Sequence, residues 1–293
     1  MTSPDTPPVS ADDSPREGII AAAQRYTALI VGMILAGMVM SLALSSMASL
    51  RGVPGPTIAE AITPVSAILA LFGCLVVTFV IAAGVGRIVN PAVGTFVLGA
   101  GVGTVALGSG SHLDLLFAGV SGPMVAVETL VWGGVVLVLA AGIHRLTGPL
   151  PDQPEQSAAD AVNPTLVFSP LALRSAGAGI VALIIVFLFA SNDLKGQALA
   201  AAVIAGIATG HIGRVLAPKI QPILLYAAPA VFLAIGQLVV FGGGADDLIA
   251  TWMQDGGPRL AIPTPVDVAA GSLMGVSMGI GFSRGFVEAH AGR

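Results

Sequence analysis

The sequence predicts an all-α, polytopic integral membrane protein, a bundle of about eight transmembrane helices. Of its 293 residues, 55% are hydrophobic and 10% are charged, whereas a soluble domain carries about 25% charged residues. The mean hydropathy is +0.92. Eight apolar stretches approach the roughly 20 residues that a helix needs to cross a bilayer. Because unpaired backbone groups are not tolerated in lipid, these stretches must be helical.

The eight expected spans fall into two sets of four. The first set covers 26–50, 61–86, 91–107 and 123–143, and the second covers 171–191, 196–215, 219–241 and 266–287. Two short amphipathic segments, 112–119 and 246–255, follow the third and the seventh span. Both are too short to cross a bilayer, so we expect them at the membrane interface.

Polar segments divide the chain into its expected parts. Residues 1–25 contain early Pro and Asp and no apolar core directly after a basic start, so they do not resemble a secretory signal. We expect a disordered cytoplasmic tail there. Residues 146–170 form the longest internal polar stretch and are expected to be a cytoplasmic linker. It joins a first membrane half, 26–145, to a second half, 171–293, which ends in a short tail.

The distribution of basic residues predicts the orientation. With eight spans, the loops on one side hold only Arg51, Lys195 and Arg259, and the other nine of the 12 Lys and Arg residues fall on the side of the N-terminus. Short loops rich in Lys and Arg face the cytoplasm. Both termini are therefore expected in the cytoplasm.

The two halves resemble each other around their first cytoplasmic hairpins. VGRIVNPAV spans Val85–Val93, and IGRVLAPKI spans Ile212–Ile220, so that Gly, Arg and Pro match at one constant offset. Two four-helix units in this order would be parallel repeats about an axis along the membrane normal. The alternative is chance similarity between hairpins that both end in a cytoplasmic arginine.

The composition excludes several partners and cofactors. The chain has no Lys/Arg run, so nucleic acid is not an expected partner. Its one cysteine, Cys74, cannot form an intramolecular disulfide, and there is no zinc motif such as HExxH. We expect no cofactor and no metal site. The expected partners are the lipid bilayer and a small solute or cation, and a homo-oligomer remains open. Abundant Ala, Gly and Val with scarce Lys favour the cytoplasmic membrane of a bacterium.

Two acids inside the expected spans are the first candidates for a functional site. Glu128 and Asp267 each follow a proline that opens a helix, Pro123 and Pro265. Ionisable groups in a membrane are costly and are functional candidates by default. A pair of close carboxylates would suit binding of a proton or cation. The alternative is that Asp267 merely starts its helix, as an acid near the positive end of the helix dipole.

The third and seventh spans are the second candidates, because both contain helix-interrupting residues at equivalent places. The third holds Gly101 and Gly103 in a glycine run, and the seventh holds Pro229 in mid-span, with Gln237 beyond it. Broken helices in matching positions indicate the binding site of a transporter. The alternative is close packing at the glycines and a tolerated kink at the proline.

Three functions compete on this evidence. The favoured hypothesis is a transporter of a small solute or ion, built from two pseudo-symmetric halves, with Glu128 and Asp267 binding the cation. A non-transport scaffold or assembly subunit is the alternative, because few polar residues lie inside the spans. A membrane-embedded enzyme is a distant third, since no convergent group of catalytic side chains stands out.

Overall fold

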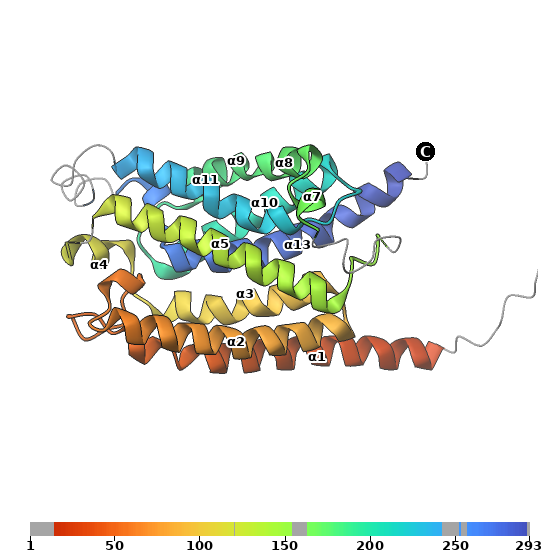
Figure 1. Ribbon diagram of the computed structural model, residues 1–293, viewed down its shortest axis with the longest axis horizontal. Helices are drawn as coiled ribbons and strands as arrows, with labels where there is room; N and C mark the ends of the chain where they lie inside the picture. The colour runs from red at the N-terminus through yellow and green to blue at the C-terminus, as the bar shows by residue number, and fades with distance from the viewer. Residues whose placement is uncertain (1–14, 120, 154–162, 242–251, 253–256, 292–293) are drawn as a thin grey trace, which may run out of the picture.

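A computed structural model describes residues 15–119, 121–153, 163–241, 252 and 257–291. This part of the chain is helical and holds eight helices that are long and apolar enough to cross a membrane. The prediction of an all-helical bundle with eight candidate spans is confirmed (Figure 1). This architecture is compatible with a multi-pass integral membrane protein.

The first half contains four long helices and one short one. They are α1 (Pro15–Ser41), α2 (Pro64–Ile88), α3 (Pro91–Gly108), the short α4 (His112–Phe117) and α5 (Gly122–Thr147), with 3-10 turns η1 (Leu44–Met47) and η2 (Ile58–Glu60) between α1 and α2. Proline occupies the first turn of α2, α3 and α5, where its missing N–H has no helical partner to lose.

The second half also contains four candidate spans. Its elements are α7 (Pro164–Val167), α8 (Pro170–Ala176), η3 (Gly177–Gly179), α9 (Ile180–Phe189), α10 (Lys195–Leu216), α11 (Ile223–Phe241), η4 (Arg259–Ala261) and α13 (Pro265–Ala291). The elements α8, η3 and α9 run on from one another and together form a single candidate span, Pro170–Phe189.

Most predicted boundaries lie within a few residues of the observed ones, but the N-terminal boundary is wrong. Helix α1 begins at Pro15, so residues 15–25 belong to a helix and not to a disordered tail. The linker predicted at 146–170 contains α7 and the start of α8, and its residues 154–162 lie outside the described part. The interfacial segment 112–119 is helical as α4. The segment 246–255 lies outside the described residues apart from Trp252.

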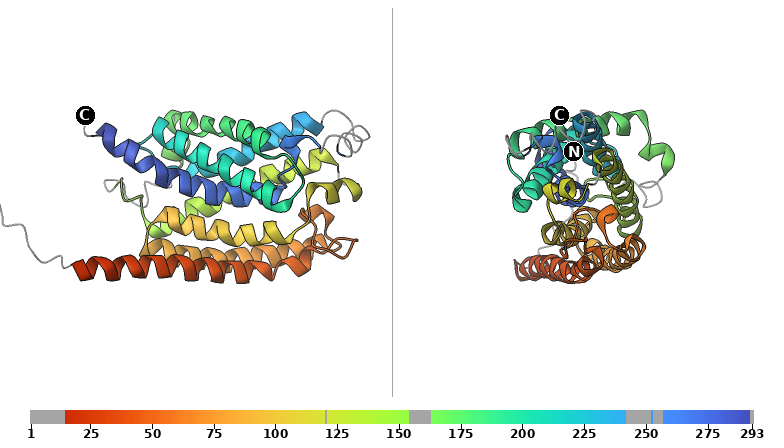
Figure 2. Two further views of the ribbon diagram at one scale, coloured as in Figure 1. Left: turned by 180° about the vertical axis from the view of Figure 1, so that it is seen from behind. Right: turned by 90° about the vertical axis from the view of Figure 1, so that its left-hand side faces the viewer.

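The long helices lie side by side, with α3 and α13 in the middle of the bundle (Figures 1 and 2). In the most apolar stretch of α13, 78% of the residues are buried, compared with 22% for α1. Helix α1 begins and α13 ends at the same end of the bundle, and α4 lies at the other end (Figure 1). We call these the terminal end and the α4 end.

The contacts between the two halves are reciprocal. The third long helix of the first half, α3, packs on the last helix of the second half, α13, and α11 packs on α5 in the same way. Reciprocal packing of this kind is expected if the two halves are related repeats. The closest pair, α10 and α13, has no equally close counterpart in α2 and α5, so the internal repeat remains a prediction.

Candidate functional site

Polar and charged side chains gather at the α4 end of the bundle, on or beside η2, α4, α5, α10, α11 and α13. Asp267 at the start of α13 is the most deeply buried of the charged ones, with 0% of its surface exposed. Its Oδ2 accepts hydrogen bonds from the backbone N–H of Thr264 at 2.9 Å and from the Thr264 hydroxyl at 2.7 Å. The acid therefore does act as a helix-start residue, as one of the two interpretations of the sequence has it.

Asp267 also has a charged partner. The ammonium group of Lys195, at the first residue of α10, donates to Asp267 Oδ2 at 2.9 Å and to the Thr264 hydroxyl at 2.9 Å. The Lys195 side chain is 15% exposed. A buried ion pair adds little net stability, because desolvation offsets the attraction. Its presence therefore needs a reason beyond holding the helices together.

Glu128 on α5 has different partners. Its Oε1 accepts a hydrogen bond from the backbone N–H of Ile58 in η2 at 3.0 Å, and the N–H of Ala59 and the side chain of Trp132 also bond it. Glu128 is 9% exposed. It thus fastens the connection between α1 and α2 to α5, and these partners differ from those of Asp267.

Gln237 on α11 links the surroundings of the two acids. Its Oε1 accepts a hydrogen bond from the hydroxyl of Thr129, the residue after Glu128, at 2.7 Å. Its Nε2 donates to the carbonyl of Pro263, just before Thr264, at 3.0 Å. Of the predicted site residues, Gln237 therefore joins the chain neighbours of Glu128 and Asp267 at the α4 end, while the two acids themselves have separate partners.

A second group of charged residues adjoins this network. Asp193, in the connection between α9 and α10, accepts hydrogen bonds from the Ser111 hydroxyl and the Leu113 backbone. Burial raises the pKa of Asp193, opposed by those two hydrogen bonds, with the charges of Asp114 and Lys195 acting as weaker influences. Asp114 is paired with Arg51.

His112 on α4 lies among aromatic rings. Its imidazole stacks on Phe241 and on Trp252, with ring centroids 5.4 and 5.0 Å apart. Burial, assisted by the ammonium group of Lys195, lowers the pKa of His112 to about 3. The ring is therefore neutral at physiological pH.

Several buried polar atoms at the α4 end have no hydrogen-bond partner. They are Thr57 Oγ1, Glu60 Oε2, His112 Nδ1, Asp193 Oδ1 and Asp267 Oδ1. Buried polar atoms are nearly always paired in native proteins, and a carboxylate oxygen can only accept. The site therefore suits a ligand that brings hydrogen-bond donors or positive charge. No group of three potential metal-ligating side chains exists among the described residues.

The expected helix interruptions are absent. Helix α3 is continuous from Pro91 to Gly108, and α11 continues through Pro229, so the prediction of broken helices is wrong. A Cβ on Gly101 would lie 2.9 Å from Thr78 Cγ2, and one on Gly103 would lie 3.1 Å from Met274 Cε. These glycines allow α3 to pack closely on its neighbours, and Pro229 is buried in α11.

The terminal end holds a separate set of buried polar residues. Arg214, which is 1% exposed, donates to Asp152 and to the carbonyl of Ile220. A basic side chain in this place, near the end of a candidate span, would be expected to extend toward the headgroups. The bonds to Asp152 and Ile220 keep it inside and fasten the start of the linker to the turn after α10.

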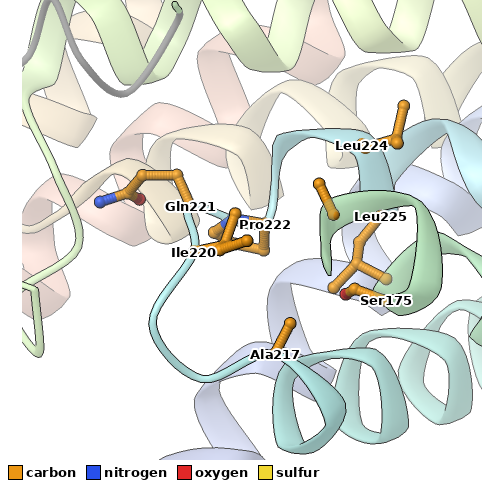
Figure 3. A pocket seen from close by; sticks show the side chains of 8 residues that line it. Ser175, Ala217, Ile220, Gln221, Pro222, Leu224 and Leu225 are labelled. Carbon is orange, nitrogen blue, oxygen red and sulfur yellow. The ribbon is translucent and has the colours of Figure 1, made fainter. Parts of the chain in front are cut away.

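A small pocket also lies at the terminal end. It has a water-accessible volume of about 10 Å³, close to the room that one water molecule needs. The side chains of Ser175, Ala217 and Leu225 converge on it, while Gln221 extends away from them (Figure 3). The pocket is too small for a solute, and it does not include the predicted site residues.

The sequence pointed to the acids of the network but missed the roles of Lys195 and Asp193. One signal was available, because Lys195 is among the few basic residues in loops predicted to face outside. No protein-family model, curated protein or solved structure matches the chain. The geometry of the network is therefore what carries the functional interpretation.

Proposed function

We propose that the protein is a cation-coupled transporter of a small solute in the cytoplasmic membrane of a bacterium, with its coupling site at the α4 end. The observation that carries this proposal is the Lys195–Asp267 ion pair at the start of two candidate spans, where Asp267 is fully buried and its second oxygen has no partner. Charged groups in such places mark ion and proton pathways in membrane proteins.

Hydrogen bonds of the network connect the surroundings of the coupling site with other helices of the bundle. Binding of a cation to the free oxygen of Asp267 weakens the hold of this carboxylate on Lys195 and on the start of α10. Gln237 bonds α11 to α5 and to the segment before α13. A change at Asp267 therefore acts on the helices of both halves, which is what alternating access requires.

The test uses the full chain reconstituted into liposomes on a solid-supported membrane. A jump in proton or sodium concentration should produce a transient current in the wild type. The double variant Asp267→Asn with Lys195→Met, which keeps the charge of the pair at zero, should lose this current. The matched control is Asp152→Asn at the terminal end, which should retain it. Folded wild-type protein that gives no current with either cation would overturn the proposal.

A second candidate function, a non-transport scaffold or assembly subunit, is favoured by one observation. Helices α3 and α11 are continuous, and neighbouring residues fill the space beside Gly101 and Gly103. A scaffold of this kind needs no binding site between its halves. Copurification of one stoichiometric membrane partner, together with an absent current, would support it. An enzymatic role has no observation in its favour.

A further inference from the structure

The environment of Lys195 specifies the kind of ligand that would bind there. We call Lys195, Asp193, Thr264, Asp267 and His112 the lysine site. Asp267 uses Oδ2 for Lys195 and leaves Oδ1 buried without a partner. Because the two oxygens of a carboxylate are covalently fixed close together, this free oxygen lies beside the Lys195 ammonium group.

The two unpartnered carboxylate oxygens disfavour an anionic ligand. The free atoms are a carboxylate oxygen on Asp267, another on Asp193, and Nδ1 of His112. Carboxylate oxygens accept hydrogen bonds and do not donate them. The two cations nearby, Lys195 and Arg51, are already paired with Asp267 and Asp114. An incoming carboxylate or phosphate would instead face the like-charged carboxylates of Asp267 and Asp193.

The charge balance of the site favours a monovalent cation. Lys195 acts electrostatically on Asp193 as well as on Asp267, so two carboxylates share one ammonium group. One further positive charge would neutralise the site. A divalent metal ion is disfavoured because no group of three His, Cys, Asp or Glu side chains that could hold one exists in the part of the chain that the structure describes.

The bonds of Lys195 show which cation fits. A primary ammonium group already donates to a carboxylate and a hydroxyl at 2.9 Å each, so the site is shaped for N–H donors. Beside it, the buried rings of Phe241 and Trp252 stack on His112, so this side of the site is apolar.

We propose that the lysine site binds a small primary ammonium compound, whose N–H groups donate to the free oxygens of Asp267 and Asp193. This inference rests on the proposed transport function for its biological meaning, since the ammonium compound is then the transported substrate. Binding itself does not depend on transport and is measured separately.

The test follows the fluorescence of Trp252 in the full chain in detergent. The chain has two tryptophans, so Trp132→Phe leaves Trp252 as the only reporter, stacked on His112 in the site. Methylammonium chloride is titrated at constant ionic strength. We expect a saturable change in Trp252 emission with methylammonium and none with tetramethylammonium, which carries the same charge but has no N–H donor.

Variants of the two acids establish where the probe binds. Asp267→Asn should weaken methylammonium binding on the order of tenfold or more, the value of a charge-assisted hydrogen bond, and Asp193→Asn should weaken it as well. Lys195→Met should tighten it, because a competing cation is removed. Asp152→Asn is the matched control and should leave binding unchanged. If Asp267→Asn does not fold, Asp193→Asn and the double variant Asp267→Asn with Lys195→Met carry the test.

Two results would overturn the inference. One is an equal response to methylammonium and tetramethylammonium, which would be a general salt effect. The other is binding that the acid variants leave untouched. Binding of methylammonium without a membrane current would preserve the site and refute transport. A current with protons or sodium but no methylammonium binding would preserve transport and refute this ligand class.

Discussion

At the scale of single residues, Asp267 combines two tasks that the sequence presented as alternatives. Its Oδ2 closes the start of α13 through Thr264 and also binds the ammonium group of Lys195. Capping alone would be served by an exposed acid at little cost. Full burial together with a lysine partner carries a desolvation penalty, so the pair indicates a role in binding or coupling.

The burial of His112 predicts a pH-dependent stability. The pKa of His112 is about 3 in the folded protein and about 6.5 in an unfolded chain. Between these values the unfolded chain binds the proton and the folded protein does not, so stability falls as the pH falls below about 6.5. This group alone should cost about 2 kcal/mol between pH 6.5 and pH 4.5.

Thermal unfolding in detergent at several pH values tests this expectation. His112→Leu removes the titrating group, so its melting temperature should decline less than that of the wild type between pH 7 and pH 4.5. Leu113→Ala, on the same helix, is the control. Its melting temperature should decline with pH as steeply as that of the wild type, whatever its value at pH 7. If the melting temperatures of the wild type and of His112→Leu declined equally with pH, His112 would not be buried as a neutral ring.

The hydrogen-bond partners of the two acids could not be predicted from the sequence. Glu128 and Asp267 were predicted because charged residues stand out in apolar runs. Their partners, Ile58 and Lys195, lie 70 and 72 positions away along the chain. Those contacts depend on how helices are rotated and shifted against each other, and a single sequence does not contain that information.

At the scale of elements, the contact of α10 with α13 depends on glycine. A Cβ on Gly275 would lie 2.8 Å from the Cα of Gly206 and 2.9 Å from the backbone N of Ile207. The backbones of the two helices are in contact there, as in other small-residue interfaces of membrane proteins. Gly275→Ala should separate the helices and destabilise the protein by about 1 to 3 kcal/mol.

Gly281, on the same helix, provides a matched control. Nothing lies within 4 Å of a Cβ placed on it, so Gly281→Ala should be neutral or slightly stabilising, since alanine favours helix formation. Melting temperatures of both variants in detergent are compared with the wild type. Equal stability of the two variants would refute the close contact at Gly275.

The helices themselves were largely predictable, for reasons that particular residues make clear. Prolines at positions 64, 91 and 265 open α2, α3 and α13, and apolar runs fix their lengths. The error at α1 arose because residues 15–25 are more polar than the span they precede. The expected break in α3 failed because glycines in a helix need not interrupt it when neighbours such as Met274 pack on them.

At the scale of the whole molecule, the reciprocal packing of α3 on α13 and of α11 on α5 couples the two halves. Each half contributes its last helix to the other, so neither half can move as an independent bundle. The Gln237 bridge from α11 to α5 lies in one of these two contacts. Any motion proposed for transport must therefore include sliding along both contacts.

The orientation of the molecule in the membrane can be tested at two exposed positions. In a Cys74→Ser background, single cysteines replace Leu50, which is 90% exposed in the connection after α1, and Thr165, which is exposed in α7. Three candidate spans separate the two positions, and the Lys/Arg distribution puts Leu50 outside and Thr165 in the cytoplasm. A membrane-impermeant maleimide should label Leu50→Cys in intact bacteria and Thr165→Cys only after the membrane is opened. The reverse pattern would place the lysine site in the cytoplasm, and labelling of both from outside would refute three crossings between them.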